Sequence, residues 1–187
     1  MLLPGMNRNA CCRFVTILVH AFFFSLSVAQ AQFTFSQHCR DAYRSMLELR
    51  FEDARKSLDA EKISSPSNLF PVYLENYIDF LTVFIGEERG LFEKFREDRE
   101  SRMRRIEKGD PDSPYHRYCL GSMHLQWAVL RMKFGESRAA LADIARAHSD
   151  LVSNRGKYPS FCPMRHRWDS SISWPGWCRI PTGGSLT

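Results

Sequence analysis

Two stretches of this chain, LELRFEDARKSL at Leu47–Leu58 and LRMKFGESRAAL at Leu130–Leu141, share one pattern. In each, an apolar stripe with helical spacing ends at a corner that carries a basic residue and Phe, and a second such stripe begins. A helix pair of this kind cannot bury its apolar face alone, so neighbouring pairs must stack. The repetition therefore predicts an all-α fold of antiparallel helix pairs in a short array. The match sets residues of the first copy against those of the second: Phe51 against Phe134, Arg55 against Arg138 and Leu58 against Leu141.

Helical spacing also runs through the rest of residues 36–159. A corner near Arg50 divides two short helices, and Pro66, within a run rich in Ser and Asn, ends the second one. The segment 70–85 is apolar on nearly every side, which predicts a buried central helix. Strand patterns are absent from the sequence.

The second half of the body predicts three more boundaries. An amphipathic helix after residue 87 ends near Gly109, and Ser113 followed by Pro114 is typical of the next helix start. The last helix follows Gly135. In that helix we expect four apolar residues to face the core: Leu141, Ile144, Ala145 and Leu151.

The first copy resembles the helix-turn-helix unit of the tetratricopeptide-repeat family. Ala54 and Leu58 are similar to the family's Ala-x-x-x-Phe, Ala42 stands where the family places a small residue, and Pro66 stands where it places its closing Pro. The resemblance implies stacked units that contact a protein or peptide, and an ordinary helical bundle is the alternative. The sequence, with aromatic-rich divergent repeats after an export signal, also resembles secreted repeat proteins of Bacteroidota. In the second copy, Ala128, Ala140 and Ala147 fit the family spacing in one register, whereas the match to the first copy implies another register.

Residues 1–31 predict a secretory signal peptide. Arg8 and Arg13 precede an apolar run, and Ala29 and Ala31 form a small-x-small cleavage site. Cleavage after Ala31 would leave an exported chain, periplasmic or secreted, with no stable membrane span. Because the apolar run is shorter than the ~20 residues that cross a bilayer, a permanent transmembrane helix is the second interpretation.

Residues 162–187 are irregular and hold three of the four Trp. With free choice of synonymous codons, the neighbouring frame from Phe161 onward can be read as FLPN and, after a short gap, LGLLHILAGMVPDTYRW. The Trp codons force Gly, Ala and Val in that string, which is apolar at helical spacing. We therefore expect an out-of-frame ending, and a genuine Trp-rich tail is the alternative. An out-of-frame ending would leave the helix after Gly135 with an uncovered apolar face.

Charge and cysteine usage narrow the functional classes. The formal charge of +5 falls to +1 within residues 32–161, and the remaining charges are evenly mixed, which predicts no nucleic-acid binding. Cys39 and Cys119 are the cysteines of this body. An exported protein could join them in a disulfide, and two buried free thiols are the alternative.

Catalytic and metal-binding patterns are weak. His116 and His124 lie on one predicted helix but at a spacing that does not suit a zinc pair, so packing is the favoured interpretation. Sequence motifs predict no cofactor. A stripe of Tyr73, Tyr77 and Phe80, continued by Phe84, fits a core, although repeat arrays also bind peptides along such a face.

The sequence thus predicts a non-catalytic helical-repeat interaction module of an exported protein, with a protein or peptide partner. An accessory domain of a larger exported enzyme or transporter is the second hypothesis. A small metal-dependent enzyme that uses His116 and His124 is the third.

Overall fold

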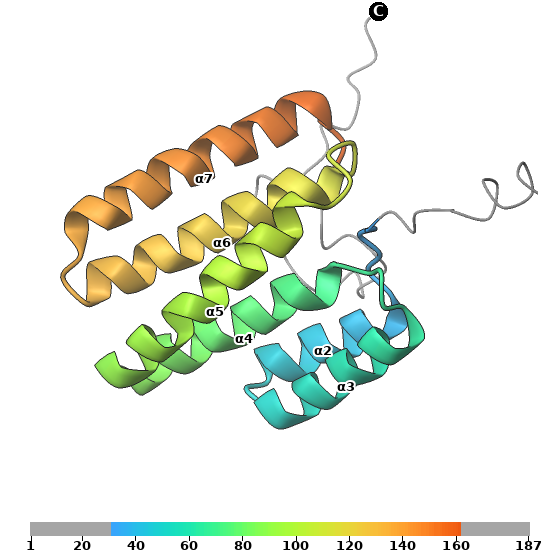
Figure 1. Ribbon diagram of the computed structural model, residues 1–187, viewed down its shortest axis with the longest axis horizontal. Coiled ribbons are helices and arrows are strands. Elements are labelled where there is room, and N and C mark those ends of the chain that lie inside the picture. Colours follow the sequence, from blue (N-terminus) through green and yellow to red (C-terminus); the bar gives the residue numbers. More distant parts are fainter. Residues whose placement is uncertain (1–30, 162–187) are drawn as a thin grey trace, which may run out of the picture. The chain divides into compact units, whose positions relative to one another are not determined.

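The computed structural model describes residues 31–161, and every named element there is a helix (Figure 1). The predicted signal peptide, with Ala29, and the tail 162–187 lie outside the described residues; Ala31 is the first residue within them. One isolated parallel bridge joins Gln32 to Asn68. The helices are α2 (Gln37–Leu47), α3 (Phe51–Ser64), α4 (Phe70–Gly86), α5 (Arg89–Glu107), α6 (Pro114–Lys133) and α7 (Ser137–Lys157).

The helices form three successive pairs. Contacts within a pair are most extensive between α6 and α7 and between α2 and α3. The first helix of each later pair packs on both helices of the pair before it, so α4 contacts α2 and α3, and α6 contacts α4 and α5. Figure 1 shows α4, α5, α6 and α7 following one another in this way. The predicted all-α fold is therefore confirmed over residues 31–161, and the packing is consistent with a helical array.

Helices α2 and α6 both begin at side-chain caps, of which the one at Ser113 was predicted. Ser36 precedes α2 and its hydroxyl accepts a hydrogen bond from the Cys39 backbone N–H at 3.2 Å. Ser113 precedes α6 and accepts from the Tyr115 N–H at 3.3 Å, with Pro114 in the first turn. These hydroxyls satisfy amide groups that have no partner inside the helix.

Each pair turns at one residue in the left-handed region. These residues are Leu49 (φ 60°), Glu87 (φ 55°) and Gly135 (φ 81°). The first and third corners share their hydrogen bonds, because the Arg50 N–H donates to the Ser45 carbonyl (2.8 Å) as the Glu136 N–H does to the Arg131 carbonyl (2.7 Å). Such a bond closes a helix end around a left-handed residue.

The shared corner decides between the two registers that the sequence left open for the internal repeat. Leu49 is equivalent to Gly135, whereas the sequence match set Leu49 against Met132, three residues earlier. The corrected register pairs Ala42 with Ala128 and Ala54 with Ala140, and all four are buried. The sequence match was wrong because it aligned similar side chains, while the backbone turn fixes which positions are equivalent.

The prediction of which residues of α7 face the core was also wrong. Leu141 is 66% exposed, Ile144 and Ala145 are exposed, and Leu151 is half-buried. Small and polar residues of α7 are buried instead: Ala140, Asp143, Ala147 and Asn154.

Close helix packing explains this rotation of α7. A Cβ added at Gly121 of α6 would lie 2.8 Å from Leu151 Cγ and 3.2 Å from the Ala147 carbonyl oxygen. Gly121 and Ala147 therefore let the two backbones approach, and larger residues on this face would separate them.

Two apolar clusters fill the spaces between the pairs. The larger one joins α2, α3, α4 and α6 through Met46, Leu58, Tyr73 and Met123. The smaller one lies near the α4–α5 and α6–α7 corners and contains Val83, Phe92, Trp127 and Leu130. Removing these side chains from water is the main source of stability in such a fold. Among helices α2 to α7, none combines the length and apolar character that a bilayer-spanning helix needs.

The left-handed corners give a test of the structure. Gly135→Ala places a Cβ where a left-handed backbone disfavours it, and should lower the free energy of unfolding by about 1 kcal/mol. Leu49→Gly relieves the same strain at an exposed side chain and should raise it by roughly 0.5 kcal/mol. Urea denaturation measures both. Equal signs for the two changes would contradict this account of the corners.

Candidate functional site

The residues expected to pack the repeats divide into three groups. Phe51 and Phe134 are half-buried against the two apolar clusters. Pro66 is exposed in the turn between α3 and α4, and Leu141 is exposed on α7. The remaining members are almost fully buried: Ala42, Ala54, Leu58, Ala128 and Ala140.

Cys39 and Cys119 are free thiols and both are buried. Burial raises the pKa of the Cys39 thiol to about 11, and it raises the pKa of Cys119 well above its ordinary value. The structure thus agrees with the second interpretation of this pair, two buried thiols. A thiol with a raised pKa holds little thiolate near neutral pH and is a poor nucleophile or metal ligand.

The two histidines of α6 do not converge on one site. His116 lies 3.4 Å from the Glu107 carbonyl and its ring meets Phe33 edge-on. His124 is buried and lies 2.9 Å from a carboxylate oxygen of Asp143. Within residues 31–161, no group of three His, Cys, Asp or Glu side chains is placed to hold a metal ion.

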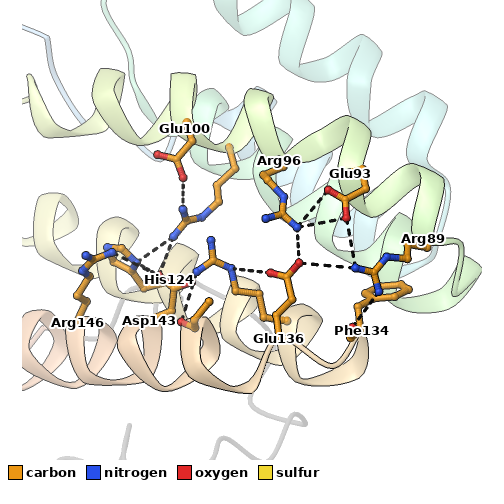
Figure 2. A network of polar contacts seen from close by, with 12 residues as sticks. Arg89, Glu93, Arg96, Glu100, His124, Phe134, Glu136, Asp143 and Arg146 are labelled. Atoms are coloured by element: carbon orange, nitrogen blue, oxygen red, sulfur yellow. Dashed lines mark hydrogen bonds and ion pairs between the residues drawn. The ribbon is translucent and has the colours of Figure 1, made fainter.

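The contacts of His124 belong to an ion cluster around the buried Asp143, which we define as Arg99, His124, Arg131 and Asp143. Figure 2 shows His124 and Asp143 within it. Asp143 is fully buried and binds Arg99 of α5 at 2.9 Å and Arg131 of α6 at 2.8 Å. The guanidinium of Arg99 also lies 5.6 Å from the ring centroid of Trp127. The cluster therefore joins α5, α6 and α7 at one point.

Opposing effects act on the Asp143 carboxyl. Burial raises its pKa, whereas the hydrogen bond with His124 and the charges of Arg99 and Arg131 lower it, and the net pKa is below the ordinary value. Asp143 is thus a carboxylate at neutral pH. Because its folded pKa is depressed, the stability it contributes is present above an ordinary pKa of 3.8 and is lost as the pH falls below that value.

A second set of ion pairs continues along α5. Figure 2 shows Glu136, next to the α6–α7 corner, between Arg96 and Arg89. Glu136 lies 2.5 Å from Arg96 and 3.9 Å from Arg89. With Asp143, these contacts hold the start and middle of α7 against α5.

The preceding pair repeats this arrangement. Asp79 of α4 is buried and binds Arg55 of α3 at 2.9 Å and Arg102 of α5 at 2.6 Å. Removing one partner from such a group leaves an uncompensated buried charge, so these ions specify which helices meet. Asp79, Arg99 and Asp143 were not predicted from the sequence. For the two acids, the available signal was a carboxylate within an otherwise small or apolar helical face.

The ion cluster is poorly suited to catalysis. An Asp–His contact can support general base chemistry when the acid orients the ring toward a nucleophile. Here both carboxylate oxygens of Asp143 meet arginines, and His124 Nδ1, the nitrogen near Asp143, also lies 3.2 Å from Arg99. The geometry instead fits a structural joint between helices.

An aromatic stripe on the first helices of the pairs reaches the surface. We define it as Tyr43 of α2 with Tyr77, Phe80 and Phe84 of α4. Neighbouring ring centroids lie 6.5, 5.9 and 5.7 Å apart along this order. Tyr77 and Phe80 are half-buried and Phe84 is 40% exposed, whereas Tyr73, which was grouped with them, is fully buried.

Charged side chains border the exposed end of the stripe. Lys133 of α6 lies 4.5 Å from the Phe84 ring centroid and donates to the Phe84 carbonyl at 3.0 Å. The same ammonium binds Glu87 at 2.6 Å.

Burial raises the pKa of Tyr43 to about 12 and also raises that of Tyr77, so both phenols are neutral at physiological pH. The stripe is thus a neutral aromatic surface with a charged rim.

Comparison of the chain with protein-family models finds no match, and comparisons with curated proteins and with solved structures find none either.

The ion cluster predicts a pH-dependent stability. Asp143→Asn removes the fully buried carboxylate that Arg99 and Arg131 share and leaves them only Glu100 and Glu136, which are partly exposed, so it should lower the free energy of unfolding at pH 7 by about 3 kcal/mol. The wild-type chain should lose this contribution as the pH falls below 3.8 toward the lowered pKa of the folded state, so the variant should show a flatter acid profile.

Thermal or urea unfolding across this pH range measures the difference. Asp150→Asn is the matched control, since Asp150 pairs with Arg117 at 3.7 Å near the surface and should change stability by less than about 1 kcal/mol. Similar losses for both variants would contradict the role of Asp143.

The buried thiols give a separate test. Native mature protein should leave Cys39 and Cys119 unmodified by iodoacetamide at pH 7.5, while denatured protein should react at both, because burial and a raised pKa suppress the thiolate. Mass spectrometry of peptides reads the result. Detection of a Cys39–Cys119 disulfide in exported protein would contradict it.

Proposed function

We propose that this chain is a non-catalytic helical-repeat module of an exported protein, similar to tetratricopeptide-repeat units, that binds an apolar segment of a protein or peptide. The observation that carries the proposal is the aromatic stripe, whose rings emerge from the core along α4. Tyr and Phe provide large contact areas with little loss of side-chain entropy, and a charged rim around them is typical of interfaces.

The repeat character of the proposal is supported by the corrected register. Equivalent small residues, Ala42 with Ala128 and Ala54 with Ala140, occupy buried positions in the first and third pairs. Small residues at such positions allow the helices of a pair to approach closely. These are the spacings on which the resemblance to tetratricopeptide repeats rests.

The non-catalytic character is supported by the use of the buried ionisable groups. Asp79 and Asp143 are each bound by two arginines, and both cysteines have raised pKa values. Binding of apolar segments also fits the balanced charge of residues 32–161, which favours a protein partner over a nucleic acid.

Export is supported by the first described residues. The backbone N–H of Gln32, the expected first mature residue, donates to the Ser67 carbonyl at 3.0 Å, and its carbonyl accepts from the Leu69 N–H at 2.8 Å. A start at Gln32 would retain both of these hydrogen bonds. It would remove Ala31, whose side chain packs against the larger apolar cluster and whose carbonyl accepts a hydrogen bond from the Asp110 N–H at 3.3 Å.

Peptide selection tests this function. A phage-displayed random peptide library selected on immobilised mature chain should enrich peptides with closely spaced apolar residues. Phe84→Ser should weaken their binding at least about tenfold, as truncation of an interface aromatic does. Fluorescence anisotropy with purified peptides measures the dissociation constants.

Ile63→Ser is the matched control, because Ile63 is 82% exposed on α3 and outside the stripe. It should leave binding unchanged. No enriched peptide, or equal losses from both substitutions, would refute the proposed surface.

A further inference from the structure

Three aromatic rings lie at the beginnings of the three helix pairs, and a fourth ring follows the last pair. Phe35 precedes α2, Phe70 begins α4, Tyr115 lies in the first turn of α6, and Phe161 follows α7. Consecutive ring centroids lie 4.9, 5.1 and 5.0 Å apart. This aromatic ladder places one ring at the start of each pair, and Phe161 is its fourth ring.

The position of Phe161 is fixed by several contacts. Its ring also meets Tyr118 edge-on at 5.9 Å, and its N–H donates to the Tyr158 carbonyl at 3.0 Å. Lys157, at the end of α7, binds Asp112 of the α5–α6 loop at 2.6 Å. The chain leaving α7 is therefore directed back to the start of α6, where a further helix would begin.

The outer face of the last pair is apolar and exposed. We define it as the exposed large apolar residues of α6 and α7: Leu125, Val129, Met132, Leu141, Ile144 and Val152. On α6 these residues recur at intervals of four and three, which is the spacing of a helical packing face. Exposed apolar residues grouped on one helix pair are typical of a surface that another element covers.

The earlier pair shows what such a face receives. On α4, Asn76 binds Gln126 and Trp127 of α6 at 2.8 and 3.0 Å. On α5, Phe92 stacks on Phe134, with ring centroids 4.7 Å apart. Thus α6 lies along both helices of the preceding pair. The outer face of α6 and α7 could pack against one more helix in the same way.

We propose that this outer face is covered by a helix that continues the same polypeptide from Phe161, and that the neighbouring reading frame encodes it. With free choice of synonymous codons, the neighbouring frame can be read as LGLLHILAGMVPDTYRW, which is apolar at helical spacing, whereas residues 162–187 place Pro163, Pro175 and Pro181 in the same stretch. An intrachain helix is favoured over a second copy because Phe161 already lies at the position where it begins. The inference is independent of the aromatic stripe.

Thiol accessibility tests the proposal in two chains. One is the mature chain with residues 162–187, carrying Cys162→Ser and Cys178→Ser. The other is the gene product with the frame restored after Phe161. Each receives Leu141→Cys on the outer face or, as the matched control, Ile63→Cys on α3; both original side chains are exposed, so both variants should fold.

In the first chain, the rate of alkylation by a maleimide should be similar for Leu141→Cys and Ile63→Cys. In the frame-restored chain, Leu141→Cys should react at least about tenfold more slowly while Ile63→Cys is unchanged, since reaction then requires local opening. Sequencing of the gene around Phe161 should show codons that yield the apolar string.

Three results would overturn the proposal. Leu141→Cys could react equally fast in both chains, which would leave the face uncovered. It could already be protected in the chain with residues 162–187, which would make that segment the occupant. Protection could instead depend on protein concentration and accompany a dimeric mass, which would make a second copy the occupant.

Discussion

Each helix pair of this protein has two apolar faces and can bury only one of them within itself. The second face must be covered by the next pair, so the stability of every pair depends on its neighbour. The first helix of each later pair provides this cover, as α4 does for α2 and α3 and as α6 does for α4 and α5. The same requirement makes the exposed apolar face of α6 and α7 informative, because that pair has the same two-sided pattern.

Apolar burial alone does not determine how the pairs are oriented. Buried carboxylates do this: Asp79 joins α3, α4 and α5 through two arginines, and Asp143 joins α5, α6 and α7 through two others. A buried charge tolerates few alternative neighbours, since a shifted helix would leave it unpaired. The clusters therefore use these ionisable groups to pair helices with one another, while Phe84 at the end of the aromatic stripe stays 40% exposed.

The sequence allowed the helices to be predicted with some accuracy, and particular residues explain why. Pro66, Gly109 and the Ser113–Pro114 pair act within a few residues of where they stand, so helix ends follow from local chemistry. The burial of α4 followed from its nearly continuous apolar surface. The aromatic stripe was recognised as a pattern, but its exposure was not, because Tyr73 and Phe84 look alike in sequence and differ in what α6 covers.

The sequence by itself determined the number and approximate limits of the helices and their grouping in pairs, since local capping and apolar spacing specify both. Only the tertiary structure decided the register of the repeat and the buried face of α7. Leu49 and Gly135 share a left-handed corner that sequence similarity did not reveal, and Leu141 is exposed because Gly121, Ala147 and Asp143 direct a different face toward α6 and α5. Close backbone approach and ion pairing between distant segments outweighed the apolar preference of single residues.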